Sequence, residues 1–128
     1  MKSLILEKTL STPKIDFNSA TGVLKLEGES YPENAAKFYA PILKWIEEYF
    51  ATEVIDTTVF EFAIIYFNSS TSKIYMSLFD DLEALVAEGS DIKVRWICHS
   101  QNETAIECGE EFKEDLAKLP FDIVIVEG

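Results

Sequence analysis

The sequence predicts an α/β protein with a mostly parallel sheet, an antiparallel hairpin at its N-terminal edge and three main helices. Three observations favour this fold. Short strand-like runs open the chain, helical and strand-like patterns then alternate to its end, and turn residues separate them. Strands that alternate with helices pair in parallel through right-handed crossovers. We find no repeat, linker or low-complexity segment and expect residues 1–128 to form one domain.

The N-terminal part of the chain is expected to form the antiparallel edge. The runs Lys14 to Phe17 and Val23 to Leu26 flank the loop 18–22, in which Gly22 can adopt a positive φ, so they are predicted to form a hairpin. The run Leu4 to Leu10 is expected to add a ragged edge strand that ends before Pro13.

The first helix is predicted from Tyr31 to Phe50. Ser30 and Glu33 have the spacing of a capping box, and Pro32 suits the first helical turn because it needs no amide partner there. Residues at helical spacing then form a wide apolar face: Phe38, Tyr39, Ile42, Ile46, Tyr49 and Phe50.

The segment from Thr57 to Phe67 is predicted to be the central strand. Its apolar residues occupy both faces, which indicates cover by helices on each side. The second helix should run from Ser70 to Glu88, because Gly89 suits the position after a helix end. Its apolar positions are Tyr75, Leu78, Phe79, Leu82, Leu85 and Val86.

The last third of the chain repeats this alternation. A strand is predicted from Ile92 to Cys98, and a helix follows that opens with a second capping box, Ser100 to Glu103. Pro120 ends the helix, and Phe121 to Val126 is the last strand. The apolar stripe of this helix is expected at Ala105, Gly109, Phe112 and Leu116.

Composition and charge exclude several functional classes. Apolar residues make up 48% of the chain, which excludes a disordered protein. The formal net charge is −12, so neither nucleic acid nor an anionic membrane is an expected partner, because both are bound through clustered Lys and Arg. No apolar run approaches the roughly 20 residues that span a bilayer, and the N-terminus lacks a signal-peptide pattern. We therefore expect a cytoplasmic protein.

The polar turn after the central strand is the predicted functional feature, because partner sites collect at the carboxyl ends of parallel strands. Asn68 or Ser69 can cap the second helix, where the helix dipole favours negative charge. A phosphoryl group on Ser69, Ser70 or Thr71 would add about −1.5 to −2 charges, held by backbone amides and Lys73. A plain helix cap is the alternative, although four consecutive hydroxyl residues exceed what a cap needs.

The segment Ser30-Tyr31-Pro32-Glu33-Asn34 also has two interpretations. It is a capping box in the first. In the second it forms one wall of a partner groove, since the strand before it would end at the same edge of the sheet as Ser69 if the two strands are parallel.

The sequence gives little support for a catalytic site or a metal site. His99 is the only histidine, and its spacing to Cys98 and Cys108 matches no common zinc pattern. Cys98 and His99 are neighbours on a strand and should point to opposite faces. Neither common phosphate-binding glycine motif occurs. We expect no enzymatic activity, no metal and no cofactor. The alternative is a catalytic or small-molecule-binding domain that uses the same strand-end crevice.

Four phrases of the sequence resemble the SiaC family of bacterial regulatory phosphoproteins. They are Gly28 to Asn34, Tyr66 to Lys73, Val94 to Trp96 and Glu110 to Asp115, and they occur in the family's order over nearly the whole chain. More distantly, the layout is similar to STAS-domain anti-sigma-factor antagonists, whose phosphorylatable serine also begins a helix after a central strand.

This resemblance implies a non-enzymatic phosphoprotein that binds and activates a diguanylate cyclase when unphosphorylated, which raises cyclic di-GMP and favours biofilm growth. It also implies a partner protein kinase and a PP2C-type phosphatase. The family's phosphoacceptor directly follows the asparagine of the YxN phrase, which is Ser69 here, with Ser70 and Thr71 as alternatives. The expected partner-binding residues are Tyr31, Pro32, Glu33, Asn34, Asn68, Ser70, Thr71 and Lys73.

Overall fold

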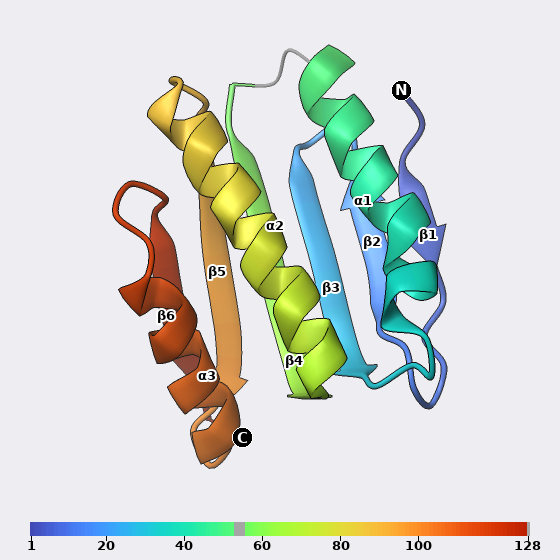
Figure 1. The fold of residues 1–128 in the computed structure, drawn as a ribbon, viewed down its shortest axis with the longest axis vertical. Helices are drawn as coiled ribbons and strands as arrows, with labels where there is room; N and C mark the ends of the chain where they lie inside the picture. Colours follow the sequence, from blue (N-terminus) through green and yellow to red (C-terminus); the bar gives the residue numbers. More distant parts are fainter. Residues whose placement is uncertain (53–55, 128) are drawn as a thin grey trace.

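The computed structural model describes residues 1–52 and 56–127, which form one six-stranded sheet and a layer of three helices (Figure 1). The predicted order of a hairpin followed by alternating helices and strands is confirmed. The elements are β1 (Leu4–Leu6), β2 (Lys14–Asn18), β3 (Val23–Ser30), α1 (Ala35–Thr52), β4 (Thr58–Phe67), α2 (Ser69–Ala87), β5 (Ile92–His99), α3 (Glu103–Glu114) and β6 (Phe121–Val126).

The sheet has the sequential strand order β1-β2-β3-β4-β5-β6. β1, β2 and β3 pair antiparallel, whereas β3, β4, β5 and β6 pair in parallel. The predicted fold class, a mostly parallel sheet with an antiparallel N-terminal edge, is therefore confirmed. The predicted ragged edge strand is shorter than expected, because only Leu4–Leu6 of that run pairs with β2.

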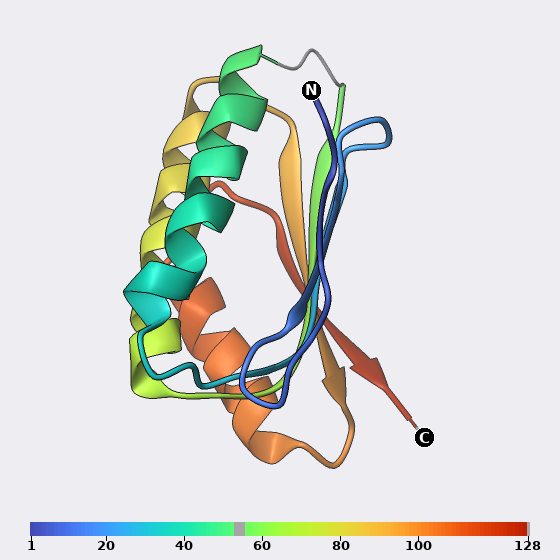
Figure 2. The ribbon, with the colours of Figure 1, turned by 90° about the vertical axis from the view of Figure 1, so that its right-hand side faces the viewer.

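All three helices pack on one face of the sheet and leave the other face open (Figure 2). The expectation that helices cover both faces of the central strand is wrong. The physical reason is the strand order: each parallel crossover moves one place in the same direction, so right-handed connections place every helix on the same side. Ile65 of β4 lies on this open face and remains 65% exposed.

The core between the sheet and the helices is dominated by aromatic rings. Phe62 of β4 contacts Tyr75, Phe79 and Trp96, with ring centroids 5.1, 5.2 and 5.7 Å apart. Such edge-to-face and stacked pairs add to the burial of their large surfaces. Gly109 is needed on α3 because a Cβ there would overlap the Trp96 indole. The predicted apolar stripe of this helix is confirmed at Ala105, Gly109 and Phe112, which are buried.

Two predicted helix starts are wrong, and both for the same reason. The first helix begins at Ala35 rather than Tyr31, and the Asn34 side chain accepts the Lys37 amide at 3.1 Å. Ser30 caps nothing, because it is the last residue of β3 and pairs with Phe67. In α3, Asn102 is likewise the N-cap instead of Ser100. The sheet thus holds the first residue of each capping-box pattern: Ser30 pairs with Phe67, and the Ser100 amide donates to the Val126 carbonyl at 2.8 Å.

Candidate functional site

The end of β4 contains a β-bulge that sets the orientation of the turn behind it. Gly28 of β3 aligns with Ile64, but the next residue, Glu29, aligns with Tyr66, so Ile65 is an extra residue. Alternation along the strand is reset at this point. Ile65 and Tyr66 are both exposed, whereas Phe67 returns to the core, where its ring lies 5.7 Å from that of Trp96.

Asn68 joins the end of β3 to the start of α2. Its backbone amide donates to the Ser30 carbonyl at 3.0 Å, and its side-chain Oδ1 accepts the Thr71 amide at 3.0 Å. Its backbone is extended, with φ −86° and ψ 175°, as an N-cap requires. The prediction that Asn68 or Ser69 caps this helix is confirmed for Asn68. Ser69 and Ser70 are then its first two helical residues.

The hydroxyl residues of this turn differ sharply in exposure. Ser69 and Ser70 are exposed, but Thr71 is completely buried. Thr71 Oγ1 lies 2.9 Å from Ser30 Oγ and donates to the Ser30 carbonyl at 3.2 Å. Ser69 and Ser70 are therefore accessible to solvent, whereas the Thr71 hydroxyl is sealed within the protein.

Behind Thr71 runs a chain of buried hydroxyl groups that connects three elements. Ser30 Oγ of β3 lies 2.7 Å from the Tyr39 hydroxyl of α1, which lies 2.8 Å from the Tyr75 hydroxyl of α2. Burial raises the pKa of Tyr39 and raises that of Tyr75 well above its usual value, so both phenols stay neutral. A fully bonded polar chain of this kind holds one specific arrangement of its elements.

The predicted second wall of the site lies at the end of β3. Tyr31 is exposed by 39%, and its ring meets that of Tyr66 edge to face, with centroids 5.8 Å apart. Pro32 is buried, whereas Glu33 and Asn34 are exposed. Because β3 and β4 are parallel, their carboxyl ends bring this segment to the same edge as the turn after β4.

Lys73 is exposed on the first turns of α2, four residues after Ser69. Residues four apart on a helix are neighbours on its surface. The structure therefore places an ammonium group within the same helical surface as the Ser69 hydroxyl.

Several residues of this region were not anticipated from the sequence as site residues. The sequence places Ser30 in a cap or in the wall of a partner groove, with no hint of a buried hydrogen-bonded chain, and places Tyr39 and Tyr75 only on apolar helix faces. The available signal was their chemistry, because a buried tyrosine needs a partner for its hydroxyl group. Ile65 and Tyr66 were also missed, since the bulge that exposes both has no signature in the strand pattern.

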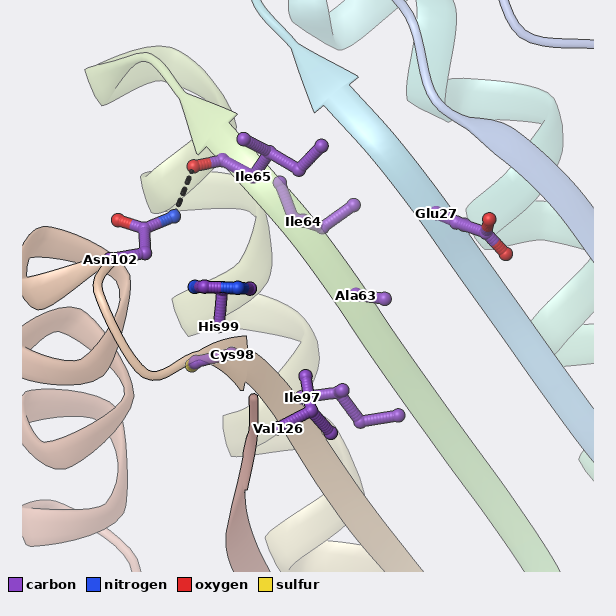
Figure 3. A pocket seen from close by; sticks show the side chains of 9 residues that line it. All are labelled: Glu27, Ala63, Ile64, Ile65, Ile97, Cys98, His99, Asn102 and Val126. Atoms are coloured by element: carbon purple, nitrogen blue, oxygen red, sulfur yellow. Dashed lines mark hydrogen bonds between the residues drawn. The ribbon is translucent and has the colours of Figure 1, made fainter. Parts of the chain in front are cut away.

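The crevice at the carboxyl ends of β4 and β5 is an open pocket of 440 Å³ (Figure 3). Aliphatic side chains dominate its lining. The Asn102 side chain already forms two hydrogen bonds, since its Nδ2 donates to the Ile65 carbonyl and its Oδ1 accepts the Ala105 amide. His99 Nδ1 accepts the Gln101 amide. A small-molecule site requires convergent polar groups. The alternative of a catalytic or small-molecule-binding domain therefore gains no support here.

The remaining candidates for chemistry are Cys98, Cys108 and His99. Cys98 is buried and His99 exposed, so the prediction that they point to opposite faces is confirmed. Burial raises the pKa of both Cys98 and Cys108, which lowers their reactivity. Within residues 1–52 and 56–127, no three potential ligands from His, Cys, Asp and Glu are grouped to hold a metal ion. In the same residues, no helix is long and apolar enough to cross a bilayer.

Comparisons with known proteins agree on one family. The family model described as SiaC family regulatory phosphoprotein matches residues 6–126. An uncharacterised protein of Pseudomonas aeruginosa strain UCBPP-PA14 is 32% identical over 123 residues, which is 96% of each chain. The structure of apo-SiaC from Pseudomonas aeruginosa is 31% identical, with a TM-score of 0.86, and covers 97% of this chain and 99% of its own.

A third similar structure contains a partner. It is the crystal structure of the diguanylate cyclase SiaD in complex with its activator SiaC from Pseudomonas aeruginosa. The matched chain is 32% identical, with a TM-score of 0.89, and the match covers 96% of this chain and 99% of that one.

Proposed function

Because the chain belongs to the SiaC family of regulatory phosphoproteins, we propose that it is a non-catalytic module that binds and activates a diguanylate cyclase. Binding belongs to the unphosphorylated form, and phosphorylation of Ser69 ends it. A protein kinase and a PP2C-type phosphatase set the phosphorylated fraction in the bacterial cytoplasm. The similar SiaC–SiaD complex supports the cyclase as the partner.

The observation that carries the proposal is the contrast between Ser69 and Thr71. Ser69 is exposed as the first residue of α2, directly after the Asn68 cap, whereas the Thr71 hydroxyl is sealed against Ser30. This contrast favours Ser69 or Ser70 over Thr71 as the acceptor. The family pattern, with the acceptor directly after the asparagine, favours Ser69 over Ser70.

A phosphate on Ser69 has a suitable environment at this position. The first amides of a helix lack intrahelical acceptors and the helix dipole favours an anion, so α2 can hold the phosphate locally. Lys73, one turn further on, can add an ion pair. The buried chain from Thr71 to Tyr75 lies behind the turn and needs no rearrangement.

The phosphate would therefore change the surface rather than the fold. A dianion at the rim of a docking face must lose its water when an apolar partner closes over it, and an unpaired buried charge is very costly. Loss of partner binding follows without any refolding of the domain.

Site mapping by mass spectrometry tests the proposed acceptor. The protein is isolated from its own cells under phosphatase inhibition, and fragment ions localise the phosphate within residues 68–73. We expect a single phosphate on Ser69, and its complete loss in Ser69→Ala but not in the matched variant Ser70→Ala. A phosphate that persists on Thr71 in the Ser69→Ala protein would contradict the assignment.

A further inference from the structure

Exposed apolar side chains gather at one end of the open sheet face. The described residues contain nine large apolar side chains that remain exposed, and five of them lie at the carboxyl ends of β3, β4 and β6: Tyr31, Ile65, Tyr66, Ile125 and Val126. Ile125 aligns with the buried Cys98 and so belongs to the face that the helices cover, which leaves the other four as one group. Exposed apolar residues are normal when scattered, but a contiguous group marks an interaction site.

Two members of this group, Ile65 and Val126, line the pocket between β4 and β5. The two strands pair only as far as Phe62 and Trp96, whereas β5 continues to pair with β6 as far as His99 and Val126. The central strand and its neighbour therefore part at their carboxyl ends. Asn102 Nδ2 bridges the gap by donating to the Ile65 carbonyl at 2.9 Å (Figure 3).

The open pocket has apolar walls from three strands. Ala63 and Ile65 of β4, Ile97 of β5 and Val126 of β6 line it, and its volume is 440 Å³. A pocket of this size, open to solvent and walled by aliphatic groups, accepts the aliphatic side chains of a macromolecular partner. We call this pocket, together with Tyr31 and Tyr66, the β4–β5 patch.

Carboxylates border the β4–β5 patch. Glu27 lines the pocket, and Glu29 is aligned with Tyr66 across the strand pair. Glu103 and Glu127 directly follow the lining residues Asn102 and Val126, and all four glutamates are exposed. Further along the open face, the cations Lys25 and Arg95 are paired with Glu61, at 3.9 and 2.8 Å. An apolar centre with an acidic rim is complementary to an apolar stripe flanked by Lys or Arg.

We propose that the β4–β5 patch docks an amphipathic helix of the protein partner, with one aliphatic side chain inserted between β4 and β5 and basic side chains on Glu27 and Glu29. The inference rests on the proposed function, since it names the surface and the chemistry through which the partner binds. A helix fits because its i, i+3 and i+4 anchors can fill one pocket and cover the two tyrosines beside it.

The position of the patch also explains how Ser69 can control it. Tyr66 lies three residues before Ser69 on the same strand-to-turn segment, and Tyr31 directly follows Ser30, whose carbonyl accepts the Asn68 amide. A helix seated on Tyr31 and Tyr66 therefore extends to the edge at which the phosphate would stand. Its apolar face would meet the dianion there.

The matched variants Ile65→Glu and Ile5→Glu test the docking surface. Both replace an isoleucine on a strand with similar exposure, 65% and 60%, but Ile5 lies on β1 at the far edge of the sheet. Binding of each full-length protein to the purified diguanylate cyclase is measured by calorimetry. We expect Ile65→Glu to weaken binding by about tenfold or more, as for the loss of a central anchor, and Ile5→Glu to leave it unchanged. Equal binding by both variants would overturn the inference.

The acidic rim is tested by charge reversal. In Glu27→Lys/Glu29→Lys we expect slower association and a weaker dependence of the association rate on salt, because rim charges steer the encounter. Unchanged association at every ionic strength would contradict a basic partner segment.

Hydrogen exchange on the wild-type protein separates the possible failures. If the wild type does not bind the cyclase, the proposed function itself fails. If it binds and protection appears in residues 63–67, the inference stands. Protection confined to the groove between α1 and α2, around Leu43, Phe50 and Leu85, would overturn the inference and leave the proposed function intact. Sedimentation that shows a dimer broken by Ile65→Glu would likewise overturn it, because a second copy would then be the occupant.

Discussion

The hydroxyl of Ser30 lies 2.9 Å from that of Thr71, and both are fully buried although 41 residues separate them in the sequence. This contact joins the end of β3 to the first turn of α2. It removes Thr71 from the surface and leaves Ser69 and Ser70 on it. Folding thus leaves the residues Ser69 and Ser70 exposed and buries Thr71, although the three are consecutive in the sequence.

The first prediction concerns the stability that this contact provides. Ser30→Ala leaves the buried hydroxyls of Thr71 and Tyr39 with one partner fewer, so we expect a loss of about 1–3 kcal/mol in the free energy of unfolding. Urea denaturation measures it. The matched variant Ser70→Ala removes an exposed hydroxyl and should stay within about 0.5 kcal/mol of wild type. Equal stability of the two variants would contradict the account of the buried chain.

The second prediction concerns the close contact between α3 and β5. In Gly109→Ala the new Cβ would overlap the Trp96 indole, and that ring cannot move freely because its Nε1 donates to the Ala105 carbonyl at 2.9 Å. We expect a loss of about 1–3 kcal/mol by thermal denaturation. Trp96→Phe in the same chain should reduce this loss, since the smaller ring leaves room. A loss of the same size in both backgrounds would exclude the overlap as its cause.

The third prediction is a pH dependence that comes from Glu83. Its carboxylate accepts the backbone amides of Ala117, Lys118 and Leu119 at 2.8, 2.8 and 2.6 Å, and these hydrogen bonds lower its pKa in the folded state. The stabilisation is thus present above the pKa of the unfolded chain and is lost as the pH falls through the lower folded value. Glu83→Gln should flatten this acid dependence of the melting temperature.

The control for this titration is Glu110→Gln, which changes an exposed glutamate on α3. We expect it to retain the acid dependence of the wild type. If Glu83→Gln and Glu110→Gln give the same curve, the three amide contacts do not contribute to stability.

The alternation of strands and helices was predictable because each element carries its own hydrophobic period. The helix starts were predicted wrongly at Ser30 and Ser100, because a capping-box pattern is local whereas contacts with distant strands hold both serines: Ser30 pairs with Phe67, and the Ser100 amide donates to the Val126 carbonyl. The direction of strand addition, which places all helices on one face, depends on the whole sheet. No single segment of the sequence indicates this direction.

The turn between β4 and α2 was also predictable only in part. Its place after the central strand and its Asn68 cap follow from turn residues and strand order. The burial of Thr71 depends on Ser30 and on two tyrosines from different helices, and these contacts form only on folding. The bulge at Ile65 depends on the register between β4 and Gly28 of β3. The exposure of Tyr66 beside the turn therefore could not be predicted from the sequence either.

The most direct test of the central claim is the activation of the diguanylate cyclase by protein that carries phosphoserine at a single, genetically encoded position. Cyclic di-GMP formation is measured with the unmodified protein, with phosphoserine at position 69 and with phosphoserine at position 70, after circular dichroism has shown that all three are folded. The account predicts activation by the unmodified protein and its loss with phosphoserine at 69. Full activation by the protein phosphorylated at 69 would contradict it.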